Sequence, residues 1–475
     1  RLDASDRPLD ELRALAPLIS AAPQPLILTC RSLAGGGLFG GEREARLEVL
    51  RHGSRLAREH AGGCYVDLEE DDPLPALGRD TRVIRSLHDF SGVPGDLEQR
   101  ARRMARRGAD VIKVACLARD LGEALQVASL PRRLDVPCVA IPLGDAGSFA
   151  RILGGAFGMP MVYGTGGSAP AAPGQIPVRD LVHVYRAHEL RPGTPLFALI
   201  GHPVGHSLSP FIHNHALQQM GMSGTYVAID CERFANIDQL AAIPIDGFSV
   251  TLPHKQHALA WASAREPTAE RLRAANTLYR QDGRMVAANT DYDGFLEALA
   301  EAHVELRGKR ALVIGAGGAA RAVVFALKDQ GARVSLFNRT PARGEALARE
   351  CQVDHVTGSV ITERADLIVQ CSACGMAPAS EASPVPAALF GPGQIAFDLV
   401  YNPLETRFLR EARQRGANCI PGLNMLAYQA RGQLLRWVGH APSKEVLRGL
   451  AEAAAAARGA ARRSAEQGDD ANRAS

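Results

Sequence analysis

The sequence predicts an α/β protein in which two series of alternating strands and helices are separated by a linker. The chain has 475 residues, which is enough for two or three domains. Its apolar runs are short and nearly continuous and alternate with helical patterns, as expected of parallel strands covered by helices. Residues 187–195 are polar and contain Pro192, Gly193 and Pro195, which marks a boundary after the first series.

The first series, residues 1–186, predicts a (β/α)8 barrel. It contains seven strand-like runs, at 25–30, 64–69, 82–88, 109–115, 136–143, 159–164 and 174–178. A helical pattern at 9–19 precedes them, and a helix that opens such a series normally follows a strand. We therefore expect the barrel's first strand to be truncated at the start of this chain. With that strand the series reaches the eight strands of a compact barrel.

The rest of the chain predicts two further domains and a tail. Residues 195–300 form a mixed strand and helix unit, and 301–422 form a second αβ series typical of a doubly wound, Rossmann-like sheet. Residues 423–450 predict C-terminal helices that return to the preceding unit. Residues 451–475 are rich in Ala and Arg and predict a helix that frays into a disordered tail.

Composition excludes several classes of partner. The formal net charge is only +3, so neither a nucleic acid nor an acidic membrane is predicted as a partner. The nine cysteines are odd in number and lie mostly in strand-like runs, which favours free thiols in a reducing, cytoplasmic setting. Because the chain starts at Arg1, the sequence does not decide whether an organellar transit peptide has been removed. Cys371 and Cys374 form an isolated C-x-x-C, so no metal is predicted. The oligomeric state is not predicted.

A glycine-rich loop predicts a dinucleotide site. The stretch VIGAGGAAR, residues 313–321, follows an apolar strand and opens an Ala-rich helix. Gly315 permits the tight turn and Gly317 lets the backbone approach a pyrophosphate, which the helix N-terminus stabilises. Ala320 stands at the third position of the fingerprint, where alanine is allowed. This strand–turn–helix context makes the motif far more specific than the glycines alone.

The end of the next strand indicates which dinucleotide binds. An NAD site usually has a carboxylate there, but this chain has Arg339, with Arg343 beyond it. Two guanidiniums suit a 2′-phosphate, so the sequence predicts NADP(H) as the cofactor rather than a merely solvated basic turn. The predicted cofactor residues are Gly315, Ala316, Gly317, Gly318, Ala319, Asn338, Arg339, Thr340, Arg343 and Gly422.

Four polar motifs between 195 and 450 resemble those of shikimate dehydrogenases, in the same order. They are GHPVGHSLSP at 201–210, SVTLPHK at 249–255, ANT at 275–277 and NTD at 289–291. The resemblance implies that Lys255 and Asp291 form the catalytic pair. It also implies the substrate-binding residues Ser207, Ser209, Thr251, Asn276 and Gln429. Hydroxyls can donate to a substrate carboxylate, and a Lys/Asp pair can pass a proton to a developing alkoxide.

This stretch departs from the family at two places. The family usually has Asn where Ser249 stands, and an Asn-Ala-Thr-Ser-like run where 370–374 reads QCSAC. The second departure lies near the expected nicotinamide. Taken singly, Lys255 could be a surface lysine and the two serines could be turn residues.

Two charged residues in the first series predict a second active site. Lys113 lies inside the apolar run ADVIKVA, where a lysine is costly unless it is paired or has a depressed pKa. A depressed pKa would make the amine a nucleophile able to form a Schiff base. His88 ends the preceding strand, and the carboxyl ends of barrel strands carry active sites. A snorkelling lysine and a core histidine are the plain alternatives.

The first series resembles type I 3-dehydroquinate dehydratases. The resemblance rests on TCR (29–31), SLHDF (86–90), GADVIKVA (108–115), FARILGGAFG (149–158) and AAPGQI (171–176). It implies that Lys113 forms an imine with the substrate ketone and that His88 moves the protons. It further implies that Arg31, Arg151 and Gln175 bind the substrate. Gly35 stands where the family carries Glu, and Ala171 where it carries Ser.

These two families catalyse consecutive steps, so the sequence predicts a bifunctional shikimate-pathway enzyme. Its small-molecule substrates would be 3-dehydroquinate and 3-dehydroshikimate, and its product shikimate. One alternative is an active dehydrogenase with an impaired dehydratase barrel, because of Gly35. Another is a non-catalytic dinucleotide-binding sensor, which the retention of Lys255 and Asp291 disfavours. The preference between quinate and shikimate is not predicted.

Overall fold

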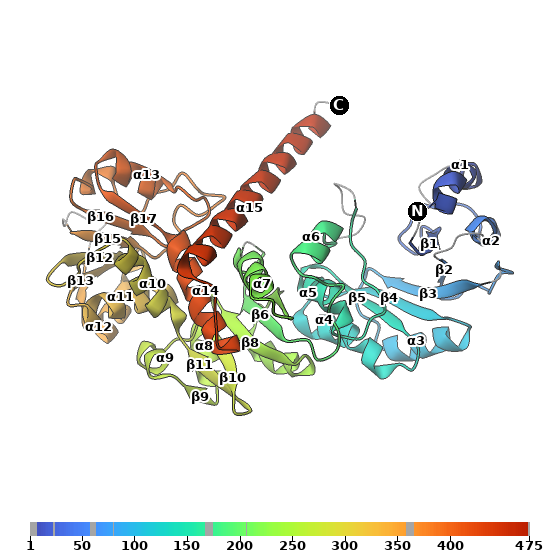
Figure 1. Cartoon of the computed structure of the whole chain (residues 1–475), viewed down its shortest axis with the longest axis horizontal. Coiled ribbons are helices and arrows are strands. Elements are labelled where there is room, and N and C mark those ends of the chain that lie inside the picture. Colours follow the sequence, from blue (N-terminus) through green and yellow to red (C-terminus); the bar gives the residue numbers. More distant parts are fainter. Residues whose placement is uncertain are drawn as a thin grey trace. The chain divides into compact units, whose positions relative to one another are not determined.

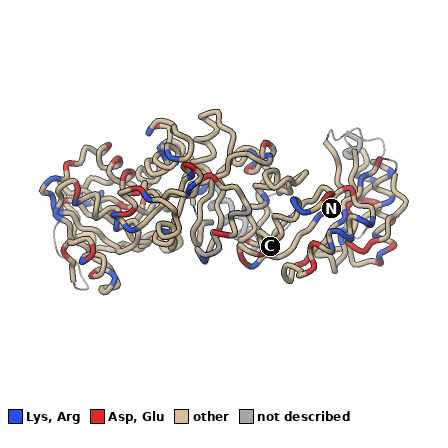
Figure 2. Tube along the Cα trace, turned by 90° about the horizontal axis from the view of Figure 1, so that it is seen from below, with Lys and Arg blue, Asp and Glu red and all other residues tan. Residues whose placement is uncertain are grey.

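The computed structural model describes residues 7–21, 24–57, 63–78, 80–166, 174–205, 207–357 and 365–473 (Figure 1). The chain forms two compact units. The N-terminal unit comprises 1–194 and 229–244, and the C-terminal unit comprises 195–228 and 245–475. Basic and acidic residues are interspersed along the trace (Figure 2), in keeping with the small net charge. No helix in the described ranges is long and apolar enough to cross a membrane.

The N-terminal unit contains a parallel sheet with the strand order β1-β2-β3-β4-β5. Strands that follow one another in both sequence and space are the arrangement of a (β/α)8 barrel. The strands are β1 (Leu26–Thr29), β2 (Cys64–Glu69), β3 (Thr81–Asp89), β4 (Val111–Leu117) and β5 (Cys138–Leu143). The helices are α1 (Pro8–Ala21), α2 (Arg43–Leu56), α3 (Leu97–Arg106), α4 (Leu121–Ala128), α5 (Ser148–Ile152) and α6 (Val178–His183).

The structure confirms five of the seven predicted strands of this unit. The runs at 159–164 and 174–178 are not strands, which corrects the sequence prediction. They meet instead through one isolated bridge between Thr165 and Pro177, where Thr165 N–H donates to the Ile176 carbonyl at 2.9 Å. Pro160 and Pro177 supply no N–H donor, which prevents a regular ladder there. The strand expected before Arg1 lies outside the described residues.

The C-terminal unit contains two sheets. The first has the order β7-β6-β8-β10-β11-β9 and the second, all parallel, the order β14-β13-β12-β15-β16-β17. The first is built from β6 (Leu196–Gly201), β7 (Thr225–Asp230), β8 (Ile245–Val250), β9 (Ala264–Arg265), β10 (Thr277–Gln281) and β11 (Arg284–Ala288). The second is built from β12 (Arg310–Ile314), β13 (Arg333–Phe337), β14 (Asp354–His355), β15 (Leu367–Gln370), β16 (Ile395–Asp398) and β17 (Asn418–Pro421). The order of the second sheet reverses between β12 and β15, which is where doubly wound sheets bind ligands.

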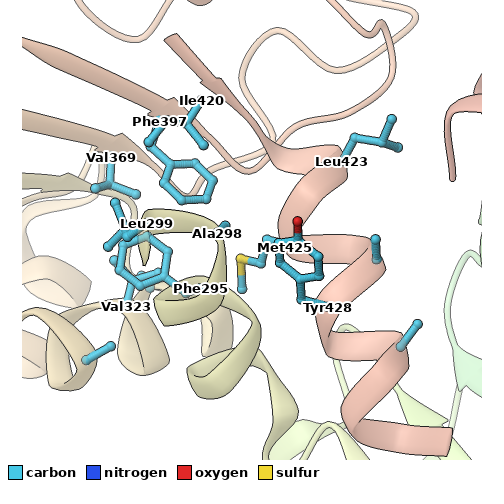
Figure 3. Close-up of a cluster of buried hydrophobic side chains, with 14 of the residues drawn as sticks. Phe295, Ala298, Leu299, Val323, Val369, Phe397, Ile420, Leu423, Met425 and Tyr428 are labelled. Atoms are coloured by element: carbon cyan, nitrogen blue, oxygen red, sulfur yellow. The ribbon is translucent and has the colours of Figure 1, made fainter. Parts of the chain in front are cut away.

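Helices of the C-terminal unit join its two sheets through one core. They are α7 (Ser209–Gln219), α8 (Lys255–Trp261), α9 (Pro267–Leu272), α10 (Thr290–Glu301), α11 (Gly318–Asp329), α12 (Pro341–Cys351), α13 (Arg407–Gln414), α14 (Gly422–Val438) and α15 (Lys444–Arg473). Figure 3 shows side chains of α10 and α14 meeting those of the second sheet. Phe295 of α10 stacks on Phe397 of β16 with ring centroids 5.0 Å apart, and Met425 of α14 is buried beside them.

Helix α15 runs as far as Arg473, through the stretch 451–475 for which a helix fraying into a disordered tail was predicted. Leu447, Leu450, Ala451 and Ala454 are buried along the first part of this helix. Their spacing of three and four residues puts them on one face of the helix. The alanine-rich sequence therefore continues an amphipathic helix, because this face is covered.

Candidate active sites

Strand register in the N-terminal unit brings charged side chains to one face of the sheet. Asp67 of β2 pairs with Ile84 of β3, and Ser86 of β3 pairs with Lys113 of β4. Paired residues of parallel strands point to the same face, and every second residue returns to it. Asp67, Ser86, His88 and Lys113 consequently share one face near the carboxyl ends of their strands, where barrels carry active sites.

Asp67 is the centre of this cluster. Its Oδ2 lies 3.0 Å from Lys113 Nζ and 2.8 Å from Arg31 Nη2, and Ser86 Oγ donates to its Oδ1. Burial by itself raises the pKa of Asp67, but Lys113 and Arg31, together with Ser86 and His88, hold the pKa of this carboxyl well below its ordinary value. The carboxylate is only 1% exposed.

Lys113 is thus paired with a carboxylate. Pairing was one of the two ways, beside a depressed pKa, in which a lysine can be accommodated inside an apolar strand. Its ammonium also lies 4.8 Å from the ring centroid of Tyr163. The sequence prediction assigned no role to Asp67. The sequence could have indicated Asp67 by the same argument that indicated Lys113. Burying a carboxylate inside the apolar run CYVDLE costs as much free energy as burying a lysine inside ADVIKVA.

The space beside Gly35 holds a carboxylate from another strand. Ser32 N–H donates to Glu69 Oε1 at 2.9 Å, and Ser32 Oγ donates to Glu69 Oε2 at 3.0 Å. A Cβ atom added at Gly35 would lie 2.8 Å from Glu69 Oε1 and 2.7 Å from Arg31 Cδ. Gly35 therefore leaves room for Glu69 and does not leave this side of the site without a carboxylate.

The remaining predicted residues of this site lie on surrounding elements. His88 is half-buried and stacks near Phe90, with ring centroids 6.4 Å apart. Arg151 of α5 is buried, and burial lowers the pKa of its guanidinium. Gln175 donates from Nε2 to the Gly164 carbonyl at 3.0 Å. Ala171 lies outside the described residues.

The C-terminal unit contains a cavity of about 400 Å³ that gathers its predicted substrate residues. The cavity lies between the two sheets. It is lined by all seven of those residues, namely Ser207, Ser209, Thr251, Lys255, Asn276, Asp291 and Gln429. Gly317 and Gly318 of the glycine-rich loop line the same cavity. A substrate bound there would meet a cofactor on that loop.

Lys255 and Asp291 are in direct contact in this cavity. Lys255 Nζ lies 2.5 Å from Asp291 Oδ2, and Asn276 Nδ2 donates to Asp291 Oδ1 at 2.8 Å. Helix starts place both charged residues, since α8 begins at Lys255 and α10 begins one residue before Asp291. The Asn289 side chain caps α10 by accepting from Asp291 N–H at 3.1 Å. The arrangement holds a lysine–aspartate ion pair against the cavity.

A buried hydrogen-bond network at the wall of the cavity, which Ser249 and Gln433 line, was missed by the sequence prediction. Tyr226 Oη donates to Ser249 Oγ at 2.7 Å, and Ser249 Oγ donates to Gln433 Oε1 at 3.0 Å. Gln433 Nε2 then donates to Thr277 Oγ1 at 3.2 Å. Ser249 is smaller than the Asn that the family usually carries at this position. Its hydroxyl makes a hydrogen bond to the side-chain amide of Gln433. One sequence feature could have indicated Gln433. It follows Gln429 by one helical turn and therefore lies on the same face of the helix.

The glycine-rich loop has the shape that a dinucleotide requires. Gly315 has φ +115°, and a Cβ atom there would lie 3.1 Å from the backbone of Cys371 and Ser372. Helix α11 starts at Gly318, after Gly317. A Cβ atom at Gly318 would lie 3.0 Å from Lys255 Cδ, so the loop borders the Lys255–Asp291 pair. The loop and the start of the helix fit a pyrophosphate.

The end of β13 suits the predicted 2′-phosphate. Arg339, Thr340 and Arg343 are exposed, and the Asn338 side chain donates to the Thr340 carbonyl at 2.8 Å. Both guanidiniums are therefore open to an anion. Gly422, at the start of α14, also lines the cavity, and a Cβ atom there would lie 2.5 Å from the Leu399 carbonyl oxygen.

Family models match three stretches of the chain. They are type I 3-dehydroquinase over residues 1–192, shikimate dehydrogenase substrate binding domain over 199–278, and shikimate / quinate 5-dehydrogenase over 298–383. A chloroplastic bifunctional 3-dehydroquinate dehydratase/shikimate dehydrogenase of Arabidopsis thaliana is 30% identical over 477 residues, covering 92% of this chain and 76% of the relative. The chain belongs to this bifunctional family.

Other similarities concern the dehydrogenase alone. An NADP(+) shikimate dehydrogenase of Thermus thermophilus is 44% identical over 265 residues, which are 55% of this chain and 98% of the relative. The crystal structure of a shikimate 5-dehydrogenase of the same species, in complex with NADP(H) and shikimate, superposes with a TM-score of 0.52 at 42% identity, covering 55% of this chain and 99% of that one. The predicted family and the NADP(H) class of the dehydrogenase are thereby confirmed.

Proposed function

We propose that the chain dehydrates 3-dehydroquinate to 3-dehydroshikimate in its N-terminal unit and reduces 3-dehydroshikimate to shikimate with NADPH in its C-terminal unit. One observation carries the proposal most strongly. The seven residues assigned to the second substrate and the glycine-rich loop line one cavity, with Lys255 against Asp291 inside it. The N-terminal assignment is supported by the cluster of Arg31, Asp67 and Lys113.

In the dehydratase, Lys113 acts as the nucleophile. Its amine adds to the substrate ketone and water leaves, which gives an imine. The imine withdraws electrons, so His88 can remove the neighbouring C–H proton and return it to the departing hydroxyl, which leaves as water. Hydrolysis of the imine releases 3-dehydroshikimate and restores Lys113. Arg31, Arg151 and Gln175 bind the substrate carboxylate and hydroxyls.

In the dehydrogenase, the chain orients the ketone and supplies a proton. NADPH, when bound, supplies the hydride. Lys255 protonates the oxygen as charge develops on it, and Asp291 holds Lys255 in place. Ser207 and Ser209 donate hydrogen bonds to the carboxylate, while Asn276, Thr251 and Gln429 contact the ring and its hydroxyls.

On this proposal the chain divides into a dehydratase domain at 1–186, a substrate domain at 195–300, an NADP domain at 301–422 and returning helices at 423–450. The enzyme works in a reducing aqueous compartment, such as the cytoplasm. The nine cysteines support this, since all of them are free thiols in the structure.

Borohydride trapping tests the dehydratase directly. Full-length protein is incubated with 3-dehydroquinate and borohydride, and the adduct is located by mass spectrometry. We expect a stable adduct on Lys113, and none in Lys113→Ala. An unmodified wild-type chain that still oxidises shikimate with NADP⁺ would support the alternative of an inactive barrel. The Glu69 carboxylate beside Gly35 speaks against that alternative.

A further inference from the structure

The C-terminal helix α15 brings a positive charge to a loop that adjoins the dehydrogenase cavity. The buried face of this helix carries Leu447, Leu450, Ala451 and Ala454. The next position of that face, four residues on, is Arg458. A guanidinium therefore stands where continued packing alone would favour an apolar side chain.

Arg458 reaches the loop that carries the two substrate serines. Its Nη2 donates to the Gly205 carbonyl at 3.3 Å. Gly205 lies between Val204 and Ser207, and both of these line the cavity. This hydrogen bond ties α15 to the backbone that sets the position of the Ser207 hydroxyl, and Ser209 N–H donates to that hydroxyl at 3.1 Å.

The charge of Arg458 also acts on a tyrosine of the cavity wall. Tyr401 lines the cavity with Ser207 and Ser209. Burial raises the pKa of the Tyr401 hydroxyl, and the positive charge of Arg458 opposes that rise. The positive charge of Arg458 thus acts on a residue of the pocket wall.

We propose that Arg458 is a positioning residue for the anionic end of the dehydrogenase substrate. It holds the serine loop through the Gly205 carbonyl and adds positive potential that favours a carboxylate between Ser207 and Ser209. The inference rests on the proposed function, which places the substrate carboxylate there. A role in binding the carboxylate, and not in the chemistry, requires that KM change while kcat stays constant.

Steady-state kinetics of shikimate oxidation with NADP⁺ by full-length Arg458→Ala test this. Losing one hydrogen bond and one nearby charge raises KM for shikimate by about fivefold, with kcat within about twofold. The dissociation constant for NADP⁺ stays unchanged. Arg458→Lys, which keeps the charge, recovers part of the loss. The matched control is Arg448→Ala on the same helix, because Arg448 pairs with Glu301 of α10 and not with the loop. Its KM for shikimate stays at the wild-type value.

Two results would overturn the inference. One is an unchanged KM in Arg458→Ala. The other is an equal rise in Arg448→Ala, which would mean that KM follows helix stability. If the wild-type chain itself does not oxidise shikimate, the proposed function fails instead, and the two failures are distinguished by that reaction.

Discussion

The two units each contain a lysine–aspartate pair, and the difference between the pairs corresponds to the difference in chemistry. Lys113 lies 3.0 Å from Asp67, and Lys255 lies 2.5 Å from Asp291. Asp67 Oδ2 is shared with a second cation, Arg31, at 2.8 Å. Asp291 Oδ1 instead accepts from the neutral amide of Asn276.

This difference determines whether the lysine can leave its partner. On the proposed mechanism, Lys113 becomes an imine, and Arg31 then still neutralises the buried Asp67, so no carboxylate is left without a cation. Lys255 on the same proposal only passes a proton and stays beside Asp291 throughout. A shared carboxylate suits a covalent lysine, and an exclusive contact suits an acid–base lysine.

The largest expected effect separates the two pairs by activity. Lys113→Ala removes the nucleophile and lowers dehydratase turnover by at least about 10⁴-fold. Reduction of 3-dehydroshikimate is measured in the same preparation and stays at the wild-type rate. Residual dehydratase activity near the wild-type level would contradict covalent catalysis by Lys113.

The reciprocal variant is expected to have the next largest effect. Lys255→Ala removes the proton donor and lowers kcat for 3-dehydroshikimate reduction by about 10³-fold, while the dehydratase is unaffected. Spectrophotometric NADPH consumption measures the first activity and enone formation the second. A variant that loses binding of 3-dehydroshikimate but keeps kcat would show that Lys255 only holds substrate.

The shared carboxylate makes a prediction about stability. Asp67→Asn removes the anion that Lys113 and Arg31 share and leaves Arg31 with the more distant Glu69, at 3.9 Å. We expect this to lower the free energy of unfolding of the N-terminal unit by about 3 kcal/mol. Asp291→Asn removes the carboxylate partner of Lys255 alone. The expected loss in the free energy of unfolding of the C-terminal unit is therefore about 1 kcal/mol smaller. Denaturant titrations of both variants make the comparison. Equal losses would mean that the second cation at Asp67 contributes nothing.

Acidification is expected to change the stability of the C-terminal unit through His213. Burial lowers the pKa of His213 to about 4, from 6.5 when exposed. Between these values the unfolded chain binds a proton that the folded chain does not, so His213 by itself contributes a loss of up to about 3 kcal/mol as pH falls from 6.5 to 4. Asp398 of the same unit acts in the opposite direction, because burial raises its pKa to about 7. The stability that Asp67 contributes is lost only at lower pH, since its pKa is depressed from 3.8.

His213→Gln tests this contribution. It removes the titrating imidazole, so the variant should lose less stability than the wild type as pH falls from 6.5 to 4. If the unfolding free energies of the wild type and the variant change in parallel through this pH range, His213 is not the source of the stability loss.

The smallest expected effect concerns Gly35. Restoring the family's carboxylate in Gly35→Glu lowers the dehydratase rate by about tenfold, because the new Cβ would crowd Arg31 and Glu69. Gly35→Ala, with the same crowding and no charge, is the matched control and loses a similar factor. A higher rate in the Glu variant alone would show that a carboxylate is missing.

Sequence patterns predicted best those features that depend on residue order and periodicity. The run at 82–88 predicted β3 at Thr81–Asp89, and four motifs in family order predicted a set of residues that one cavity assembles. Periodicity alone could not exclude the proline-containing runs at 159–164 and 174–178, which lack a regular ladder. Asp67, Glu69 and Gln433 were missed because their roles depend on partners distant in sequence.

The most direct test is a coupled assay of the whole chain with 3-dehydroquinate and NADPH as the only substrates. We expect one NADPH to be oxidised for each shikimate formed. We also expect Lys113→Ala and Lys255→Ala each to abolish the coupled reaction, and a mixture of the two variants to restore it. Reduction of added 3-dehydroshikimate without any NADPH oxidation from 3-dehydroquinate would contradict the claim that both lysine–aspartate pairs are catalytic.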